Sequence, residues 1–155
     1  MQEVIEILTK LNKTIATMES CTGGGVANAI TNIEGASEVL KYSAVTYSNE
    51  YKIKMGVNQK TINKYSVYSM EVAREMAENI SNFANSNYGI GITGKLNRVD
   101  VNNPFGEDNV TFISIYDKDN NIYHDFKVKA TKSSRALNKD LIINKITQEL
   151  LDIIR

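Results

Sequence analysis

Ser20 and Cys21 stand where an apolar, β-prone run gives way to three glycines, Gly23 to Gly25. Residues 14–18, the glycines and the helix-prone stretch 26–30 predict a strand, a tight turn and a helix in that order. Such a turn places a hydroxyl at the end of a strand, where backbone N–H groups can hold a phosphate or a developing oxyanion. Glycines there let a ligand approach the backbone closely. Similar turns are often purely structural, so this segment alone leaves the function open.

A serine nucleophile needs a base, and two residues are candidates. The single histidine, His124, falls in a predicted hairpin strand, where a structural role is the usual one, and this disfavours a Ser-His-Asp triad. Lys52 follows the predicted strand 41–48 and meets Ser20 at one sheet edge if the two strands are parallel neighbours. A lysine whose pKa is lowered by burial can act as the base. The alternative is that Lys52 belongs to a solvated helix face, as most lysines do.

Cys21 is a rival nucleophile, because a cysteine beside a helix start can be activated. Small buried cysteines in such turns are more often inert packing residues. Cys21 is also the only cysteine, so the chain has no internal disulfide. One Cys and one His disfavour a zinc site, because zinc usually takes three or four such ligands. We expect no metal in the site.

Composition narrows the class of protein. The chain has 155 residues, 42% of them hydrophobic, which predicts a single globular domain over residues 1–155. Eighteen basic and 18 acidic residues give a formal net charge of +0, which argues against nucleic-acid binding driven by bulk charge. Glu3 and Glu6 interrupt the apolar N-terminal segment, so we expect neither a signal peptide nor a membrane span. The expected location is the cytoplasm.

Helix and strand patterns alternate along the chain. They predict helices over residues 4–11, 26–31, 49–55, 58–64 and 70–85 and after Ser133 or Ser134, and strands over 14–18, 41–48, 88–93, 110–116 and 122–130. Apolar spacing assigns Leu11, Phe83 and Leu137 to the inward faces of their helices. The last two strands form a hairpin, and a polar loop runs from 95 to 109. The predicted fold is a three-layer α/β/α sandwich with a mixed, mostly parallel sheet and one β-hairpin.

Several motifs together resemble the CinA C-terminal domain family, whose characterised activity is deamidation of nicotinamide mononucleotide. Their order and spacing match over essentially the whole chain, and because nothing precedes them the chain resembles the stand-alone form of the family. The motifs are Glu19-Ser20-Cys21-Thr22-Gly23-Gly24, Gly35-Ala36-Ser37, Val45-Thr46-Tyr47-Ser48-Asn49-Glu50, Val72-Ala73-Arg74-Glu75-Met76-Ala77 and Gly91-Ile92-Thr93-Gly94.

This resemblance implies roles for individual residues. The family nucleophile falls on Ser20, its catalytic lysine on Lys52 and its assisting tyrosine on Tyr47. It implies hydrolysis of the carboxamide of a small nucleotide to give ammonia and nicotinate mononucleotide, with no cofactor. Substrate contacts are implied for Cys21, Thr22, Gly23, Gly24, Thr93 and Gly94.

The chain departs from the family pattern around the expected substrate. The loop 95–108 lacks most of the family's glycines, so phosphate contacts would come from the side chains of Lys95 or Arg98, unless these belong to a solvated loop face. Segment 65–69 also differs from the family pattern. Before the last helix, Arg135 is kept while its neighbours are changed, and the resemblance implies a substrate contact for it as well.

These departures keep two other functions open. The chain could be a divergent, non-catalytic member that binds a nucleotide-like ligand or a partner protein. It could also be an amidase for another small carboxamide. Retention of Ser20, Tyr47 and Lys52 together favours an enzyme. Whether the chain forms a homo-oligomer is left open by the sequence.

Overall fold

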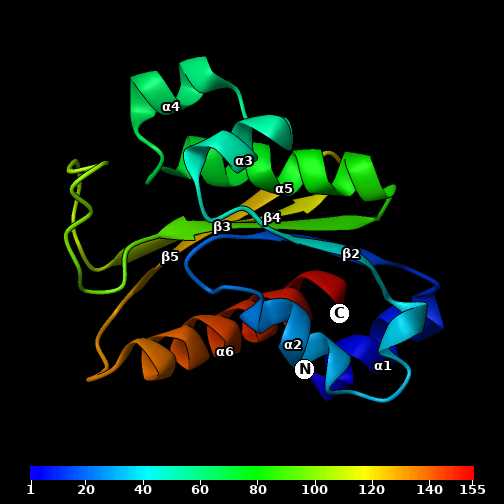
Figure 1. The fold of residues 1–155 in the computed structure, drawn as a ribbon. Helices are drawn as coiled ribbons and strands as arrows, with labels where there is room; N and C mark the ends of the chain where they lie inside the picture. The colour runs from blue at the N-terminus through cyan, green and yellow to red at the C-terminus, as the bar shows by residue number, and fades with distance from the viewer.

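A five-stranded sheet in the order β2-β1-β3-β4-β5 forms the centre of the molecule (Figure 1). The strands are β1 (Ile15–Glu19), β2 (Leu40–Val45), β3 (Tyr88–Gly94), β4 (Val110–Asp117) and β5 (Ile122–Lys129). The structure is a computed structural model that describes residues 1–155. β1 pairs in parallel with both β2 and β3, while β4 and β5 form an antiparallel hairpin beside β3.

Helices cover both faces of this sheet. They are α1 (Gln2–Leu11), α2 (Gly25–Thr31), α3 (Asn49–Lys54), α4 (Gln59–Tyr65), α5 (Met70–Ala84) and α6 (Arg135–Ile154), with a short 3₁₀ turn, η1, at Ala36–Glu38. α1, α2 and α6 lie on one face, and α3, α4 and α5 lie on the other (Figure 1). This is the predicted three-layer α/β/α arrangement with a mixed sheet. None of the helices combines the length and the apolar character needed to cross a membrane.

The two faces of the sheet carry separate cores. The core beneath α1, α2 and α6 contains 21 buried residues, and the one beneath α5 contains seven. α5 packs so closely on β3 that a Cβ added at Gly91 would lie 2.2 Å from the Ala73 carbonyl oxygen. All five residues of β1 are buried, as expected for a central parallel strand covered on both faces.

Three residues assigned to inward helix faces are exposed instead, so these assignments were wrong. Leu11, the last residue of α1, is 49% exposed. Phe83 is 66% exposed and contacts Tyr42 of the edge strand β2, with ring centroids 5.2 Å apart. Leu137 is 48% exposed because the buried stripe of α6 recurs every fourth residue and begins at its neighbour Asn138. That stripe consists of Asn138, Ile142, Ile146, Leu150 and Ile154.

The strand predicted over residues 41–48 was too long. β2 ends at Val45, and Ser48 instead caps α3 by accepting a hydrogen bond from the Tyr51 N–H. Ser, like Asn and Asp, favours this position because its side-chain oxygen satisfies an otherwise unpaired helix N–H. The early end of the strand turns the chain back, so that α3 approaches the end of β1.

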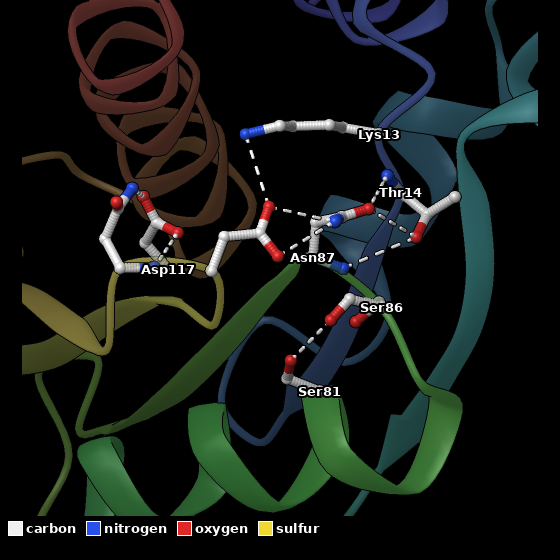
Figure 2. Close-up of polar contacts among 8 residues, drawn as sticks. Lys13, Thr14, Ser81, Ser86, Asn87 and Asp117 are labelled. Carbon is white, nitrogen blue, oxygen red and sulfur yellow. Dashed lines mark hydrogen bonds and ion pairs between the residues drawn. The ribbon is translucent and has the colours of Figure 1, made fainter.

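Polar contacts join the loops at the amino ends of the parallel strands β1 and β3 (Figure 2). The Asn87 side-chain oxygen accepts a hydrogen bond from the Thr14 N–H at 2.9 Å, and its amide nitrogen donates to Asp119 at 3.0 Å. Lys13 pairs with the same Asp119 carboxylate at 3.3 Å. These contacts join the amino ends of β1 and β3, and the parallel pairing of the two strands brings their carboxyl ends side by side.

Candidate active site

The parallel pairing of β1 with β2 brings two chain segments to one sheet edge. Glu19 and Val45 are register partners at the ends of these strands, and the Thr46 N–H donates to the Glu19 carbonyl oxygen at 2.9 Å. Ser20 follows directly on β1. α3 then carries Lys52 back toward Ser20, and the Lys52 side chain is buried with 2% of its surface exposed.

Ser20 and Lys52 are in direct contact, as expected from the parallel arrangement of β1 and β2. The Lys52 Nζ lies 3.0 Å from the Ser20 Oγ and donates to the Thr46 carbonyl oxygen at 2.7 Å. Burial lowers the pKa of Lys52 to about 8, although the negative charge of Asp100 partly offsets it. A substantial share of the amine is therefore neutral near pH 8 and able to accept the Ser20 proton.

The glycine turn is held by a buried glutamate. Glu19 accepts hydrogen bonds from the Thr22 hydroxyl at 2.7 Å and from the N–H groups of Val26 and Ala27, both at 3.0 Å. Gly24 has a φ of +92°, a conformation that side-chain-bearing residues rarely adopt. This role of Glu19 is not evident from the sequence, because a glutamate at the end of a strand gives no signal that its side chain will bind the N–H groups of the following helix.

Replacing Glu19 with Gln should destabilise the fold. The substitution leaves an amide NH₂ facing backbone N–H donors, so we expect the free energy of unfolding to fall by roughly 1–3 kcal/mol. Urea unfolding at neutral pH would show this as a lower midpoint with an unchanged slope. Glu38→Gln is the matched control, because Glu38 is exposed and its side chain makes no hydrogen bond. Equal midpoints for the two variants would contradict the role given to Glu19.

Cys21 is poorly suited to be the nucleophile. Its side chain is buried, and its Sγ lies 3.8 Å from the Thr111 hydroxyl. Burial raises the pKa of the Cys21 thiol to about 11, so the reactive thiolate is scarce at neutral pH. The structure thus favours Ser20 over Cys21.

A cavity of about 700 Å³ opens beside Ser20 and Lys52. Among the other residues predicted for the site, those that line it are Tyr47, Cys21, Gly94, Lys95, Arg98 and Arg135. Those outside its lining are Thr22, Gly23, Gly24 and Thr93. Tyr47 is 66% exposed at this cavity. The Thr93 hydroxyl instead donates to the Val67 carbonyl oxygen at 2.9 Å, which positions the wall formed by residues 67 and 68.

The three basic residues predicted to contact the substrate differ in their surroundings. The buried Lys95 ammonium donates to the Phe105 carbonyl oxygen at 3.1 Å and pairs with Asp108 at 3.2 Å, so it holds its own loop together. Arg135 donates to the Leu96 carbonyl oxygen at 3.4 Å. Arg98 is exposed and forms no hydrogen bond or ion pair within the chain, which leaves its guanidinium free to bind an anion.

One pair in the wall of the cavity was not found from the sequence. The Tyr68 hydroxyl donates a hydrogen bond to the Asp100 carboxylate, which also accepts from the Asn103 side chain at 3.0 Å. Burial and this bond raise the pKa of Tyr68, and the bond lowers the pKa of Asp100. Tyr68 lies in the segment 65–69, whose departure from the family pattern was the only available signal.

Comparison with known proteins identifies the same family that the sequence motifs resemble. The CinA C-terminal domain family matches residues 1–151. A competence-damage inducible protein of Clostridium botulinum is 50% identical over 96 residues, which cover 61% of this chain and 24% of that protein. A relative with the same description from Thermoanaerobacter is 46% identical over 96 residues, 61% of this chain and 23% of its own. The match therefore spans about a quarter of these curated relatives.

Solved structures share the fold. The competence/damage inducible protein CihA from Agrobacterium tumefaciens superposes with a TM-score of 0.88 at 24% identity, covering 99% of this chain and 92% of that one. A CinA superfamily protein from Escherichia coli gives a TM-score of 0.86 at 23% identity, covering 98% and 87%.

Proposed function

The chain belongs to the CinA C-terminal domain family, and from that premise we propose that it is an amidohydrolase that converts nicotinamide mononucleotide to nicotinate mononucleotide and ammonia. The observation that carries this proposal is the 3.0 Å contact between Ser20 and the buried Lys52, in a cavity large enough for a small nucleotide. A nucleophile beside a base of lowered pKa is the arrangement that covalent amide hydrolysis needs.

The chemistry proceeds in two stages. Neutral Lys52 takes the proton of Ser20 as its oxygen attacks the carboxamide carbon, and the tetrahedral intermediate collapses as Lys52 returns that proton to the leaving ammonia. Water, deprotonated by Lys52, then attacks the acyl-enzyme and releases the acid, and Ser20 regains its proton. Tyr47, at the mouth of the same cavity, is the third residue that we assign to the reaction.

The backbone beside Ser20 supports stabilisation of the oxyanion. The N–H groups of Cys21 and Thr22 donate no hydrogen bond to any other residue of the chain. They follow the nucleophile directly, where the negative charge develops on the substrate oxygen. We assign these two N–H groups to the oxyanion site.

Arg98 is the residue we propose for the substrate phosphate, because it lines the cavity and its side chain makes no hydrogen bond or ion pair within the chain. Arg98→Ala should raise KM for nicotinamide mononucleotide by roughly ten- to a hundredfold, as expected for loss of a charge-assisted hydrogen bond, and change kcat little. Steady-state kinetics would measure both constants. Arg74→Ala is a matched control, because Arg74 pairs with Asp125 away from the cavity lining. An unchanged KM in the Arg98→Ala variant would show that the substrate phosphate does not bind near Arg98.

The test of the proposed function is ammonia release from the purified protein, with the Ser20→Ala protein as the blank. Nicotinamide mononucleotide, nicotinamide riboside and nicotinamide would be compared. A preference for the mononucleotide supports the proposal, whereas no release from any of them would reject it.

An amidase acting on a different carboxamide is the second candidate. The specific observation in its favour is Asp100, whose carboxylate adds a negative charge to the wall of the cavity. A carboxylate there favours substrates with hydroxyl or amino groups over those with additional anionic groups. Faster hydrolysis of the riboside, which lacks the phosphate, than of the mononucleotide would favour this candidate.

A further inference from the structure

A second cavity of about 640 Å³ adjoins the cavity that contains Ser20. The two share the lining residues Asn49, Val67, Asn102 and Asn103. The second cavity extends from these residues to α4 and the end of the loop 95–108. A molecule longer than a mononucleotide that entered from this side would therefore occupy both cavities.

The boundary between the two cavities includes a single side-chain hydrogen bond. The Asn49 Nδ2 donates to the Asn103 Oδ1 at 3.1 Å. Asn103 is in turn held by Asp100, and Asn49 belongs to the same short helix as Lys52. A bond between two neutral amides contributes little net free energy in water, so a ligand with its own donors and acceptors can replace it.

The charges of the two cavities differ. Four basic residues, Lys52, Lys95, Arg98 and Arg135, and one acidic residue, Asp100, line the first cavity, whereas Lys64 is the only charged residue that lines the second. The Lys64 ammonium lies 5.0 Å from the centre of the neighbouring Tyr65 ring. The excess of basic residues in the first cavity thus suits the phosphates of a ligand, and the second cavity, with a single charged residue in its lining, suits an uncharged ring.

The remaining lining of the second cavity suits a neutral ring with polar substituents. The side-chain amides of Asn63 and Asn102 form no hydrogen bond within the chain. Tyr65 and Phe105 supply exposed aromatic rings, 44% and 72% exposed, for stacking. Amides that can pair with ring nitrogens, together with aromatic faces, form a surface that recognises a nucleoside.

We infer that the second cavity is a subsite for a nucleoside joined through phosphate to the carboxamide-bearing part of the substrate, so that the chain accepts a nicotinamide-containing dinucleotide. This inference rests on the proposed function for the placement of the carboxamide at Ser20. The phosphates then lie near Arg98, and the second nucleoside passes the Asn49–Asn103 bond to reach Asn63 and Tyr65.

Binding to the Ser20→Ala protein tests this without turnover. Calorimetric titration with nicotinamide adenine dinucleotide and with nicotinamide mononucleotide should give at least tenfold tighter binding of the dinucleotide. Adding Tyr65→Ala should bring the ratio of the two dissociation constants close to one. Lys60→Ala on the same helix is the matched control and should preserve the ratio, because Lys60 is exposed and outside the lining. Equal affinities in the Ser20→Ala protein would overturn the inference.

A second measurement separates this subsite from the proposed function. Adenosine should shift the backbone amide resonances of residues 62–66 in the wild-type protein, and Tyr65→Ala should abolish these shifts. If adenosine binds there while no nicotinamide compound is bound or hydrolysed, the proposed function fails and the subsite stands. If nicotinamide mononucleotide is hydrolysed but adenosine leaves these resonances unchanged, the subsite is rejected and the proposed function stands.

Discussion

Ser20→Ala is expected to lower kcat for amide hydrolysis by roughly 10⁴-fold or more, because the covalent route has no other nucleophile in place. Cys21→Ala should retain most of the activity, since the raised pKa of this thiol keeps it protonated at neutral pH. Burst kinetics and mass spectrometry of a trapped acyl-enzyme would locate the attached atom.

Comparing these two variants decides whether Ser20 or Cys21 is the nucleophile. An inactive Cys21→Ala protein beside an active Ser20→Ala protein would transfer the role to the thiol. Near-equal loss in both variants, with normal unfolding midpoints, would instead show that the cysteine is needed to hold the turn in its active shape.

Lys52→Met should lower kcat/KM by roughly 10²- to 10⁴-fold, the usual contribution of a positioned general base. In the wild type, only the neutral amine accepts the proton, so kcat/KM should rise with pH and level off above the pKa of about 8. Below that pH the rise should approach tenfold per unit. Lys52→Arg should be as inactive as Lys52→Met, because a guanidinium stays protonated throughout. A pH-independent wild-type rate between pH 6 and 9 would contradict this role.

Folding stability supplies an independent check on the same residue. The pKa of Lys52 is about 8 in the folded protein against an ordinary value of 10.5, so between these values the unfolded chain binds more protons. Stability from this group therefore rises from pH 8 to about 10.5 and is lower below pH 8, where the fold must bury an ammonium. The urea midpoint of the wild type, taken relative to that of the Lys52→Met variant, should therefore increase over this pH range. A flat difference would mean that the amine is not buried in solution.

The contact between Ser20 and Lys52 could be predicted because it follows from chain topology. Two parallel neighbouring strands end at the same edge, so polar residues just beyond each strand must meet there. The pairing of Tyr68 with Asp100 could not be predicted, because it joins two irregular segments whose paths have no periodic signal. Local patterns specified which segments form helices and strands, but not the orientation of loop side chains.

Errors in assigning buried helix residues have a related physical cause. Apolar spacing identifies a stripe on a helix but not where the sheet beneath it ends. Phe83 lies at the side of the edge strand, where no further strand covers it. In α6 the inward position near the start is taken by Asn138, whose side chain bonds to both the N–H and the carbonyl oxygen of Lys132. Hydrogen bonding to a turn thus outweighed apolar burial there.

The carboxylate of Glu19 has a consequence for how charge is distributed over the site. It already supplies the negative group that complements the positive end of the α2 dipole. A substrate phosphate placed at that helix end would face a like charge in a buried setting, where repulsion is poorly screened. In the proposed mechanism, the glycine turn therefore faces only the single, transient charge of the oxyanion. The proposed mechanism then places the permanent charges of the substrate on the loop side of the cavity, a separation that would keep tight ground-state binding from competing with the reaction at Ser20.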